Sequence, residues 1–213
     1  LLFNFIYHYY DFFLWYLGDQ PIQIEYAYYK GMYAFTSALI FIIYIHILLF
    51  PRNKLETPRI PSFPPLIMLF SLNFGLLIGV YNLYIIQLYK LPEFLNYLRS
   101  IEIGSIFILS SFVLIYFSIQ SFNNYQEDPN PTTKSNILIT SGIFKYIRNP
   151  MYLALTLFQF GVGASLSFIH ICLMSFVTII LLHYFVVKKE EKYLTDKFGG
   201  SYITYLNSSR RWL

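Results

Sequence analysis

The residues best suited to chemistry lie in the last third of the 213-residue chain, in two groups separated by an apolar stretch. The first group is Arg148-Asn149-Pro150. Asparagine is a favoured N-cap and proline suits the first helical position, so we expect a helix to begin at Pro150. The unpaired N–H groups of its first turn, with Arg148 beside them, can bind a carboxylate or a phosphate. The alternative is an ordinary helix cap at a membrane interface with a snorkelling arginine.

The second group is the pair Glu190 and Glu191. The intervening apolar stretch predicts two antiparallel helices with a turn at the small residues 161–165, and such a hairpin returns the glutamates to the neighbourhood of Arg148. Adjacent acids on a helix point in different directions, so one can face a pocket while the other faces water or pairs with Lys188 or Lys192. The alternative is a solvated, charged helix end.

An aromatic and basic tail follows the glutamates. Its pattern predicts an amphipathic helix, broken at Gly199, that can cover the open end of the hairpin. The alternative is a surface helix that rests on lipid headgroups. Its aromatic side chains would then be the contacts with the membrane: Phe198, Tyr202, Tyr205 and Trp212.

The elements that position these residues belong to a membrane protein. The chain is 56% hydrophobic and only 12% charged, against about 25% charged in an ordinary soluble domain. Its apolar residues form runs near the length of about 20 residues that a membrane-spanning helix needs. We therefore predict an all-α, polytopic transmembrane bundle of five or six spans, the first doubtful because it is short and contains Asp11. The predicted spans are 2–17, 31–50, 64–89, 102–122, 150–165 and 167–187.

A polar, proline-containing segment at 123–133 divides the chain. Residues 1–122 are predicted to be transmembrane spans, and residues 123–213 to be a second part that holds both polar groups, the hairpin and the tail. The basic residues fit this arrangement. With the C-terminus cytosolic, all but three of the 15 Lys and Arg residues lie on the cytosolic side, the exceptions being Lys30, Lys90 and Arg99.

The same distribution bears on partners and location. The basic residues lie at segment ends and form no continuous stripe, which argues against nucleic acid and for a lipid bilayer. We expect a multi-pass protein of the bacterial inner membrane or the endoplasmic reticulum, with its C-terminus on the cytosolic face. The single cysteine, Cys172, is expected in the core, and the four scattered histidines have no metal-binding spacing. His183 is expected to be packed rather than catalytic.

Two stretches resemble a known family of membrane enzymes. The string LITSGIFKYIRNPMYLA, followed after the hairpin by EEKYLTDKFGGSYITYLNSSRRW, resembles the isoprenylcysteine carboxyl methyltransferase family, and phospholipid N-methyltransferases share the pattern. The family pattern is a Gly-x-aromatic turn, Arg-His-Pro-x-Tyr, a helical hairpin, and then a glutamate pair with a Phe-Gly-x-x-Tyr-x-x-Tyr tail. The order and spacing of several linked elements make the likeness more specific than any one of them.

The resemblance implies an S-adenosyl-L-methionine-dependent methyltransferase with a lipophilic substrate. Residues 123–213 would then be the catalytic core, with the cofactor pocket on the cytosolic face, and residues 1–122 would serve as scaffold and substrate access. By that resemblance Arg148 is the catalytic or substrate-orienting cation. The cofactor-binding positions would be Asn136, Ile137, Leu138, Ile139, Phe144, Asn149, Pro150, Met151, Tyr152 and Glu190. The chemistry agrees, since the cofactor has a carboxylate for a helix N-terminus, an ammonium for Glu190 and a sulfonium that aromatic faces attract.

Two positions depart from the family pattern. The family histidine is Asn149, which keeps a hydrogen-bonding side chain but does not titrate near neutral pH. Val186 occupies the place where the prenylcysteine enzymes carry a basic residue for the substrate carboxylate, which argues against prenylcysteine as substrate. A lipid amine, a thiol, a carboxylate and a small lipophile all remain open as methyl acceptors.

Two other functions compete with methyl transfer. Membrane sterol and steroid reductases that use NADPH share the fold and a similar Arg-His-x-x-Tyr turn. Here the turn continues Pro-Met-Tyr-Leu-Ala, and no basic cluster for a 2′-phosphate is evident. The third possibility is a non-catalytic membrane scaffold that retains the fold.

Overall fold

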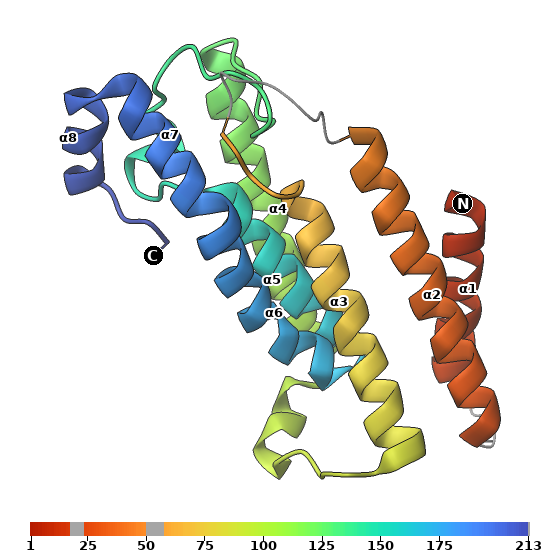
Figure 1. The fold of residues 1–213 in the computed structure, drawn as a ribbon. Coiled ribbons are helices and arrows are strands. Elements are labelled where there is room, and N and C mark those ends of the chain that lie inside the picture. The colour runs from red at the N-terminus through yellow and green to blue at the C-terminus, as the bar shows by residue number, and fades with distance from the viewer. Residues whose placement is uncertain (18–23, 50–57, 213) are drawn as a thin grey trace.

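The protein is helical throughout the part that the computed structural model describes, residues 1–17, 24–49 and 58–212 (Figure 1). The predicted spans are present as helices, but the second begins at Ile24 rather than at residue 31 and the third ends at Ile86 rather than at residue 89. The described residues do not include Phe50, at the end of the second predicted span, or Arg52 and Lys54 of the basic set. The principal helices are α1 (Leu2–Leu17), α2 (Ile24–Leu49), α3 (Pro64–Val80), α4 (Ile101–Asn124), α5 (Pro150–Ser165), α6 (Ile169–Leu182), α7 (Lys188–Phe198) and α8 (Gly200–Ser208).

Two short π-helical stretches and two 3₁₀ turns complete the described structure. The π-helix η1 (Tyr81–Ile86) extends α3, and η4 (His183–Val187) joins α6 to α7 without a break. The 3₁₀ helices are η2 (Glu93–Leu98), before α4, and η3 (Gly142–Lys145), before α5. The continuous helix from α6 through α7 carries the glutamate pair directly out of the apolar bundle.

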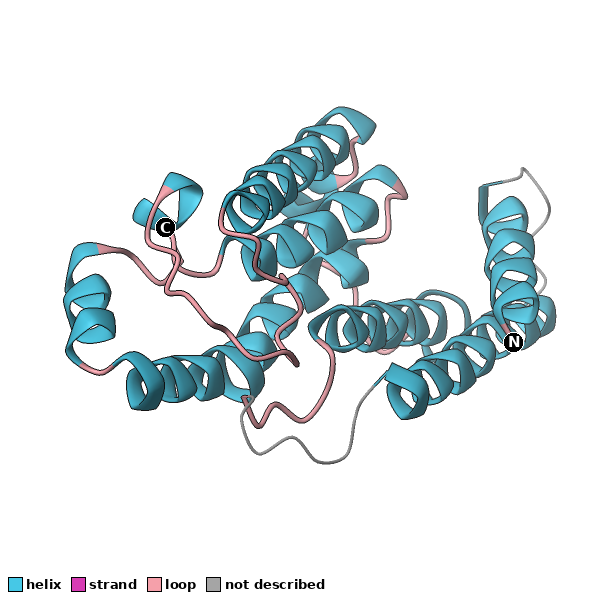
Figure 2. Ribbon diagram, turned by 90° about the horizontal axis from the view of Figure 1, so that it is seen from above, coloured by secondary structure: helices cyan, strands magenta, loops and turns pink. Residues whose placement is uncertain are grey.

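The long helices form an up-and-down bundle. The largest contacts join α4 to α5, α3 to α6 and α5 to α6, while α2 packs on α3 and α1 on α2. Figures 1 and 2 show α1 and α2 at one side of the molecule, connected to the other helices through α3. The connection between α4 and α5, the helices α7 and α8, and the C-terminus gather at one end, whereas η2 lies at the opposite end (Figure 1).

Four described helices are long and apolar enough to cross a membrane: Tyr29–Leu48, Pro64–Leu83, Ile101–Asn124 and Ile169–Phe198. The helices α1 and α5 have 16 residues each, fewer than the roughly 20 that a perpendicular crossing needs. The predicted helical hairpin is present as α5 and α6. These lengths and compositions make the chain a multi-pass membrane protein.

Small residues let α4 and α5 approach closely. Gly104 faces Gly161, and a Cβ on Gly104 would lie 2.6 Å from the Gly161 carbonyl oxygen. Ser111 and Ser118 continue the same buried face of α4, and each donates a side-chain hydrogen bond to a carbonyl of its own helix. Small faces of this kind allow helices to pack in lipid, where apolar side chains gain little from meeting one another.

Candidate active site

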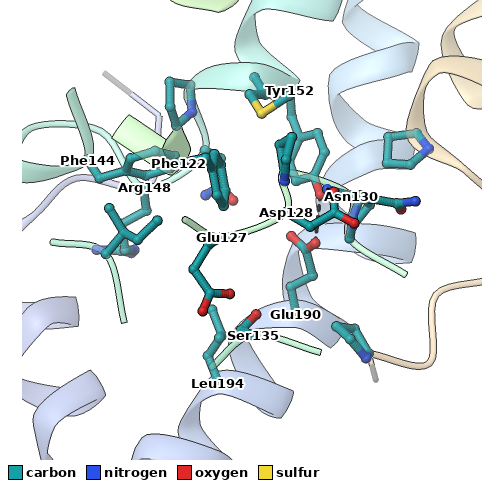
Figure 3. A pocket seen from close by; sticks show the side chains of 18 of the residues that line it. Phe122, Glu127, Asp128, Asn130, Ser135, Phe144, Arg148, Tyr152, Glu190 and Leu194 are labelled. Carbon is teal, nitrogen blue, oxygen red and sulfur yellow. Dashed lines mark hydrogen bonds between the residues drawn. The ribbon is translucent and has the colours of Figure 1, made fainter. Parts of the chain in front are cut away.

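A cavity of about 460 Å³ opens at the end of the bundle that holds α7, α8 and the C-terminus. This volume lies within the range of about 300–1,000 Å³ of small-molecule sites. Its wall joins the α4–α5 connection and the adjoining start of α5 with the first turns of α7, which lie further along the chain (Figure 3). The predicted site residues are therefore brought together, as the hairpin geometry implied.

The helix at the Arg-Asn-Pro triplet begins as predicted, but Asn149 does not cap it. Helix α5 starts at Pro150, and no side-chain capping bond comes from Asn149. The Asn149 Nδ2 instead donates to the Arg211 carbonyl at 3.0 Å, because the C-terminal chain lies alongside. The first N–H groups of a helix have no partner within it, so those of Met151 and Tyr152 stay available at the cavity wall.

Glu190 faces the cavity and is anchored by a tyrosine of the facing helix. The Tyr152 hydroxyl donates to Glu190 Oε1 at 2.7 Å, and both residues line the cavity. One carboxylate oxygen is thereby fixed by a charge-assisted hydrogen bond. The other oxygen is free to accept a hydrogen bond from a ligand, and a cationic group is its best partner.

Glu191 does not pair with Lys188 or Lys192, the partners considered from sequence. It accepts a two-point bond from Arg211, with Nε to Oε1 at 2.9 Å and Nη2 to Oε2 at 2.7 Å. Arg148 Nε lies 3.4 Å from Glu191 Oε1. Lys192 pairs instead with Asp196 on the exposed face of α7. The bonds to Glu191 raise the pKa of Arg211, which therefore stays charged.

Residues 209–212, here called the C-terminal strap, run beside the triplet and hold Arg148. The backbone N–H of Arg148 donates to the Arg210 carbonyl at 2.8 Å, and that of Arg210 to the Tyr146 carbonyl at 3.0 Å. Arg148 Nη1 donates to the Leu206 carbonyl at 3.0 Å and to the Ser209 carbonyl. The Arg148 side chain is only 9% exposed. The strap thus fixes Arg148, the residue that the sequence analysis selected as the catalytic or substrate-orienting cation.

Helix α8 supports the strap and closes one side of the cavity. Tyr202 and Tyr205 are buried and line it, and the Tyr205 hydroxyl donates to the Phe144 carbonyl at 2.7 Å. Burial raises the pKa of Tyr202, with a further contribution from the Glu191 carboxylate, and burial raises the pKa of Tyr205 to about 12. Both tyrosines are neutral hydrogen-bonding groups at physiological pH. Gly199, with φ of 54°, makes the predicted break between α7 and α8.

The connection between α4 and α5 adds two acids that the sequence analysis did not select. Glu127 and Asp128 line the cavity, and Figure 3 shows them around the same space as Glu190. The Glu127 carboxylate accepts the backbone N–H of Asn136 at 3.1 Å, and Ser135 bonds to Tyr193 and Lys197 of α7. A sequence signal for Glu127 and Asp128 was present: the two acids stand between polar and proline residues, shortly before the predicted cofactor-binding positions 136–139.

Most of the predicted positions lie on the cavity wall, and one does not. The lining includes Ile137, Leu138, Ile139, Phe144, Arg148, Asn149, Pro150, Met151, Tyr152 and Glu190. Asn136 is exposed and is not among the lining residues. Val186 is fully buried and packs with Ile60 and Leu182, away from the lining. The lining also includes Phe63, Pro64, Phe122 and Leu194, none of them predicted.

The histidines and the cysteine have structural surroundings. His183 packs against Trp212 of the strap, with ring centroids 6.3 Å apart. Cys172 is buried within the bundle, as expected. Within the described part of the chain, no group of three or more His, Cys, Asp or Glu residues has the geometry of a metal site.

The charges of the cavity favour a cationic ligand. Four acids line it, Glu127, Asp128, Glu190 and Glu191, whereas Arg148 is the basic side chain among the described lining residues. A cleft with a net negative lining attracts cations and disfavours polyphosphates. Apolar and aromatic side chains, including Phe63, Phe122 and Phe144, make up much of the remaining wall.

Comparison with known proteins agrees with this arrangement. The family described as phospholipid methyltransferase matches residues 100–201, which include α4, the α4–α5 connection, the hairpin and α7. The chain has no match among curated proteins or solved structures. The likeness inferred from the sequence motifs is confirmed: over residues 100–201, this membrane protein resembles the phospholipid methyltransferase family.

Proposed function

We propose that this protein is an integral membrane methyltransferase that uses S-adenosyl-L-methionine and acts on a lipophilic substrate, with a site like that of the isoprenylcysteine carboxyl methyltransferases. One observation carries the proposal: the segment that resembles phospholipid methyltransferases supplies most of the wall of the acidic cavity. A segment that resembles methyltransferases thus forms a cavity whose lining suits a cationic cofactor.

The residues present fit this cofactor in charge and in hydrogen bonding. The free Glu190 oxygen is suited to its ammonium, and the first turn of α5, with Arg148, to its carboxylate. The rings of Phe122 and Phe144 meet edge to face, with centroids 5.4 Å apart, and aromatic walls attract a sulfonium. When bound, the cofactor supplies a sulfonium methyl group that an acceptor's lone pair can take, leaving the thioether S-adenosylhomocysteine.

The protein's part in such a reaction is mainly positioning. Tyr152 fixes Glu190, the strap fixes Arg148, and the loop of Glu127 and Asp128 encloses the space between them. Holding two reactants in line supplies a large share of the rate when little acid or base assistance is needed. The apolar wall keeps water from competing with the acceptor.

The substrate enters, on this proposal, from the bilayer side. The start of α3 contributes Phe63, Pro64 and Pro65 to the cavity, and α4 contributes Ile115. These side chains are apolar and belong to helices long enough to span a membrane. We accordingly assign residues 1–122 to substrate access and scaffold, and 123–213 to the cofactor site, on the cytosolic face under the positive-inside rule.

The decisive experiment measures binding of S-adenosylhomocysteine and of NADPH to the detergent-purified protein by calorimetry. We expect S-adenosylhomocysteine to bind, and Arg148→Ala and Glu190→Ala to weaken that binding at least tenfold, as expected when a charged partner is lost. The matched controls are Lys192→Ala and Asp196→Ala, whose side chains are exposed. Tight NADPH binding without S-adenosylhomocysteine binding would contradict the proposal in favour of a reductase.

The substrate class has a test of its own. Membranes containing the protein are incubated with methyl-labelled S-adenosylmethionine, and the label is followed into lipid, protein and water-soluble fractions. We expect the label in a fraction that extracts into organic solvent and expect it to be absent with the Glu190→Ala variant. Label confined to water-soluble molecules would refute a lipophilic substrate.

A further inference from the structure

Arg211 of the strap makes the closest contact with Glu191, although Arg148 lies beside the same carboxylate. Arg211 uses both oxygens of Glu191, at 2.9 and 2.7 Å. Arg148 Nε is buried, makes no hydrogen bond and lies 3.4 Å from Glu191 Oε1. Two arginines therefore compete for one carboxylate, and the two-point bond belongs to Arg211.

The remaining contacts of Arg148 leave one part of its guanidinium available. Nη1 is engaged by the Leu206 and Ser209 carbonyls and lies 3.4 Å from Ser209 Oγ. Within the described residues, no hydrogen bond uses Nη2. Because Arg148 lines the cavity, this side of the guanidinium can bind an anionic group there.

We propose that Arg211 is a positioning residue: by holding Glu191 in a two-point bond, it keeps that carboxylate from capturing Arg148, whose guanidinium then stays available to an anionic ligand group in the cavity. This inference rests on the proposed function for the identity of that ligand. Carboxylates bind the planar guanidinium fork strongly, so removal of Arg211 leaves Arg148 as the nearest partner of Glu191.

The surroundings of Arg211 fit this role. Its carbonyl accepts the Asn149 side chain at 3.0 Å, and the next residue, Trp212, packs on His183. The backbone of Arg210 is bonded on both sides to the segment of Tyr146 and Arg148. The strap is thus held independently of the Arg211 side chain, and Asn149 contributes to holding it where the family has histidine.

Four variants test the inference by their affinity for S-adenosylhomocysteine. Arg211→Gln should weaken binding roughly tenfold, because the largely buried Glu191 carboxylate then turns to Arg148, while Lys192→Gln, at an exposed basic residue of α7, should leave it unchanged. Glu191→Gln should bind within about threefold of the wild type, because its neutral amide has no negative charge with which to capture Arg148. The double variant Glu191→Gln/Arg211→Gln should recover the affinity of Glu191→Gln, since no carboxylate remains to capture Arg148.

The double variant separates positioning from a general role in folding. If Arg211 only stabilised the strap, adding Glu191→Gln would not restore binding, and that result would overturn the inference. Equal affinity of Arg211→Gln and Lys192→Gln would overturn it as well. A lack of binding by the wild-type protein would instead refute the proposed function. Unfolding midpoints are measured for every variant. If Arg211→Gln proves poorly folded, Arg211→Lys, which keeps the charge, is tested beside it and should bind more tightly.

Discussion

At the scale of single residues, the chemistry depends on how each charged group is held. Glu190 is fixed by Tyr152 and Arg148 by the strap, so each keeps one part of its polar group for the cavity. Local rules in the sequence predicted where the α5 helix begins and which charges meet. They did not predict the partners of Asn149 and Glu191, because both partners are groups of Arg211, 62 and 20 residues further along the chain.

The bond between Tyr152 and Glu190 gives a first prediction. Tyr152→Phe keeps the ring and removes the donor to Glu190 Oε1, so the carboxylate loses its anchor. We expect S-adenosylhomocysteine affinity to fall by roughly three- to tenfold, which corresponds to a typical net hydrogen bond of about 0.5–1.5 kcal/mol. The control is Tyr184→Phe, at an exposed tyrosine of η4 that does not line the cavity. Equal affinities for the two variants would contradict an anchoring role.

The buried Tyr205 gives a prediction about pH. Burial raises its pKa to about 12, above the value of roughly 10 of an unfolded tyrosine. The contribution of the neutral Tyr205 side chain to the free energy of unfolding is therefore complete below about pH 10. It is lost as pH rises from about 10 to about 12, because the unfolded chain releases the tyrosine proton first. Tyr205→Phe should lower stability at pH 7 by about 0.5–1.5 kcal/mol through the lost hydrogen bond, and its difference from the wild type should shrink above pH 10.

Thermal unfolding in detergent at pH 7, 10 and 11.5 tests this pH dependence. Tyr146→Phe, at an exposed tyrosine of the η3–α5 turn, serves as the control and should follow the wild type at each pH. A difference between Tyr205→Phe and the wild type that stays constant from pH 7 to 11.5 would be incompatible with a buried, proton-bearing hydroxyl.

At the scale of elements, the hairpin α5–α6 and the α4–α5 contact determine where the site lies. The sequence predicted the hairpin, since apolar periodicity and a Gly- and Ser-containing turn are local features. It did not predict that the α4–α5 connection folds over the mouth and brings Glu127 and Asp128 to the cavity. A loop without regular pattern is positioned by bonds such as those of Asn136 to Glu127 and of Lys197 to Ser135, and such distant pairs have no local signature.

The close contact of α4 with α5 gives a prediction about stability. Gly104→Ala would place its Cβ 2.6 Å from the Gly161 carbonyl oxygen, so the two backbones must separate. We expect a loss of about 1–3 kcal/mol of stability, as for an overpacked core, and a lower unfolding midpoint. Gly200→Ala, where a Cβ meets nothing within 4 Å, is the matched control. If both alanines are tolerated equally, the tight α4–α5 packing is not present in the membrane.

At the scale of the whole molecule, all the chemistry gathers at one end of the bundle. The α4–α5 connection, α7, α8 and the strap meet there, and most of the Lys and Arg residues belong to the same end (Figure 1). Composition and the distribution of charge were sufficient to predict this polarity, because membrane insertion depends on both over many residues. Composition and charge were not sufficient to predict the number of membrane spans, because α1 and α5 are each shorter than a full crossing.

The polarity of the molecule gives a prediction about topology. Tyr97 lies in η2, at the end opposite the cavity, and is 82% exposed, while Asn207 is exposed in α8 at the cavity end. Cysteines introduced singly at these positions should react with a membrane-impermeant maleimide from opposite sides: Asn207→Cys only in inside-out vesicles, Tyr97→Cys only in right-side-out ones. The native Cys172 is 0% exposed and should stay unlabelled in the folded protein, so the wild-type chain is the control. Labelling of both positions from the same side would contradict the bundle's orientation across the membrane and, with it, a cytosolic site for the cofactor.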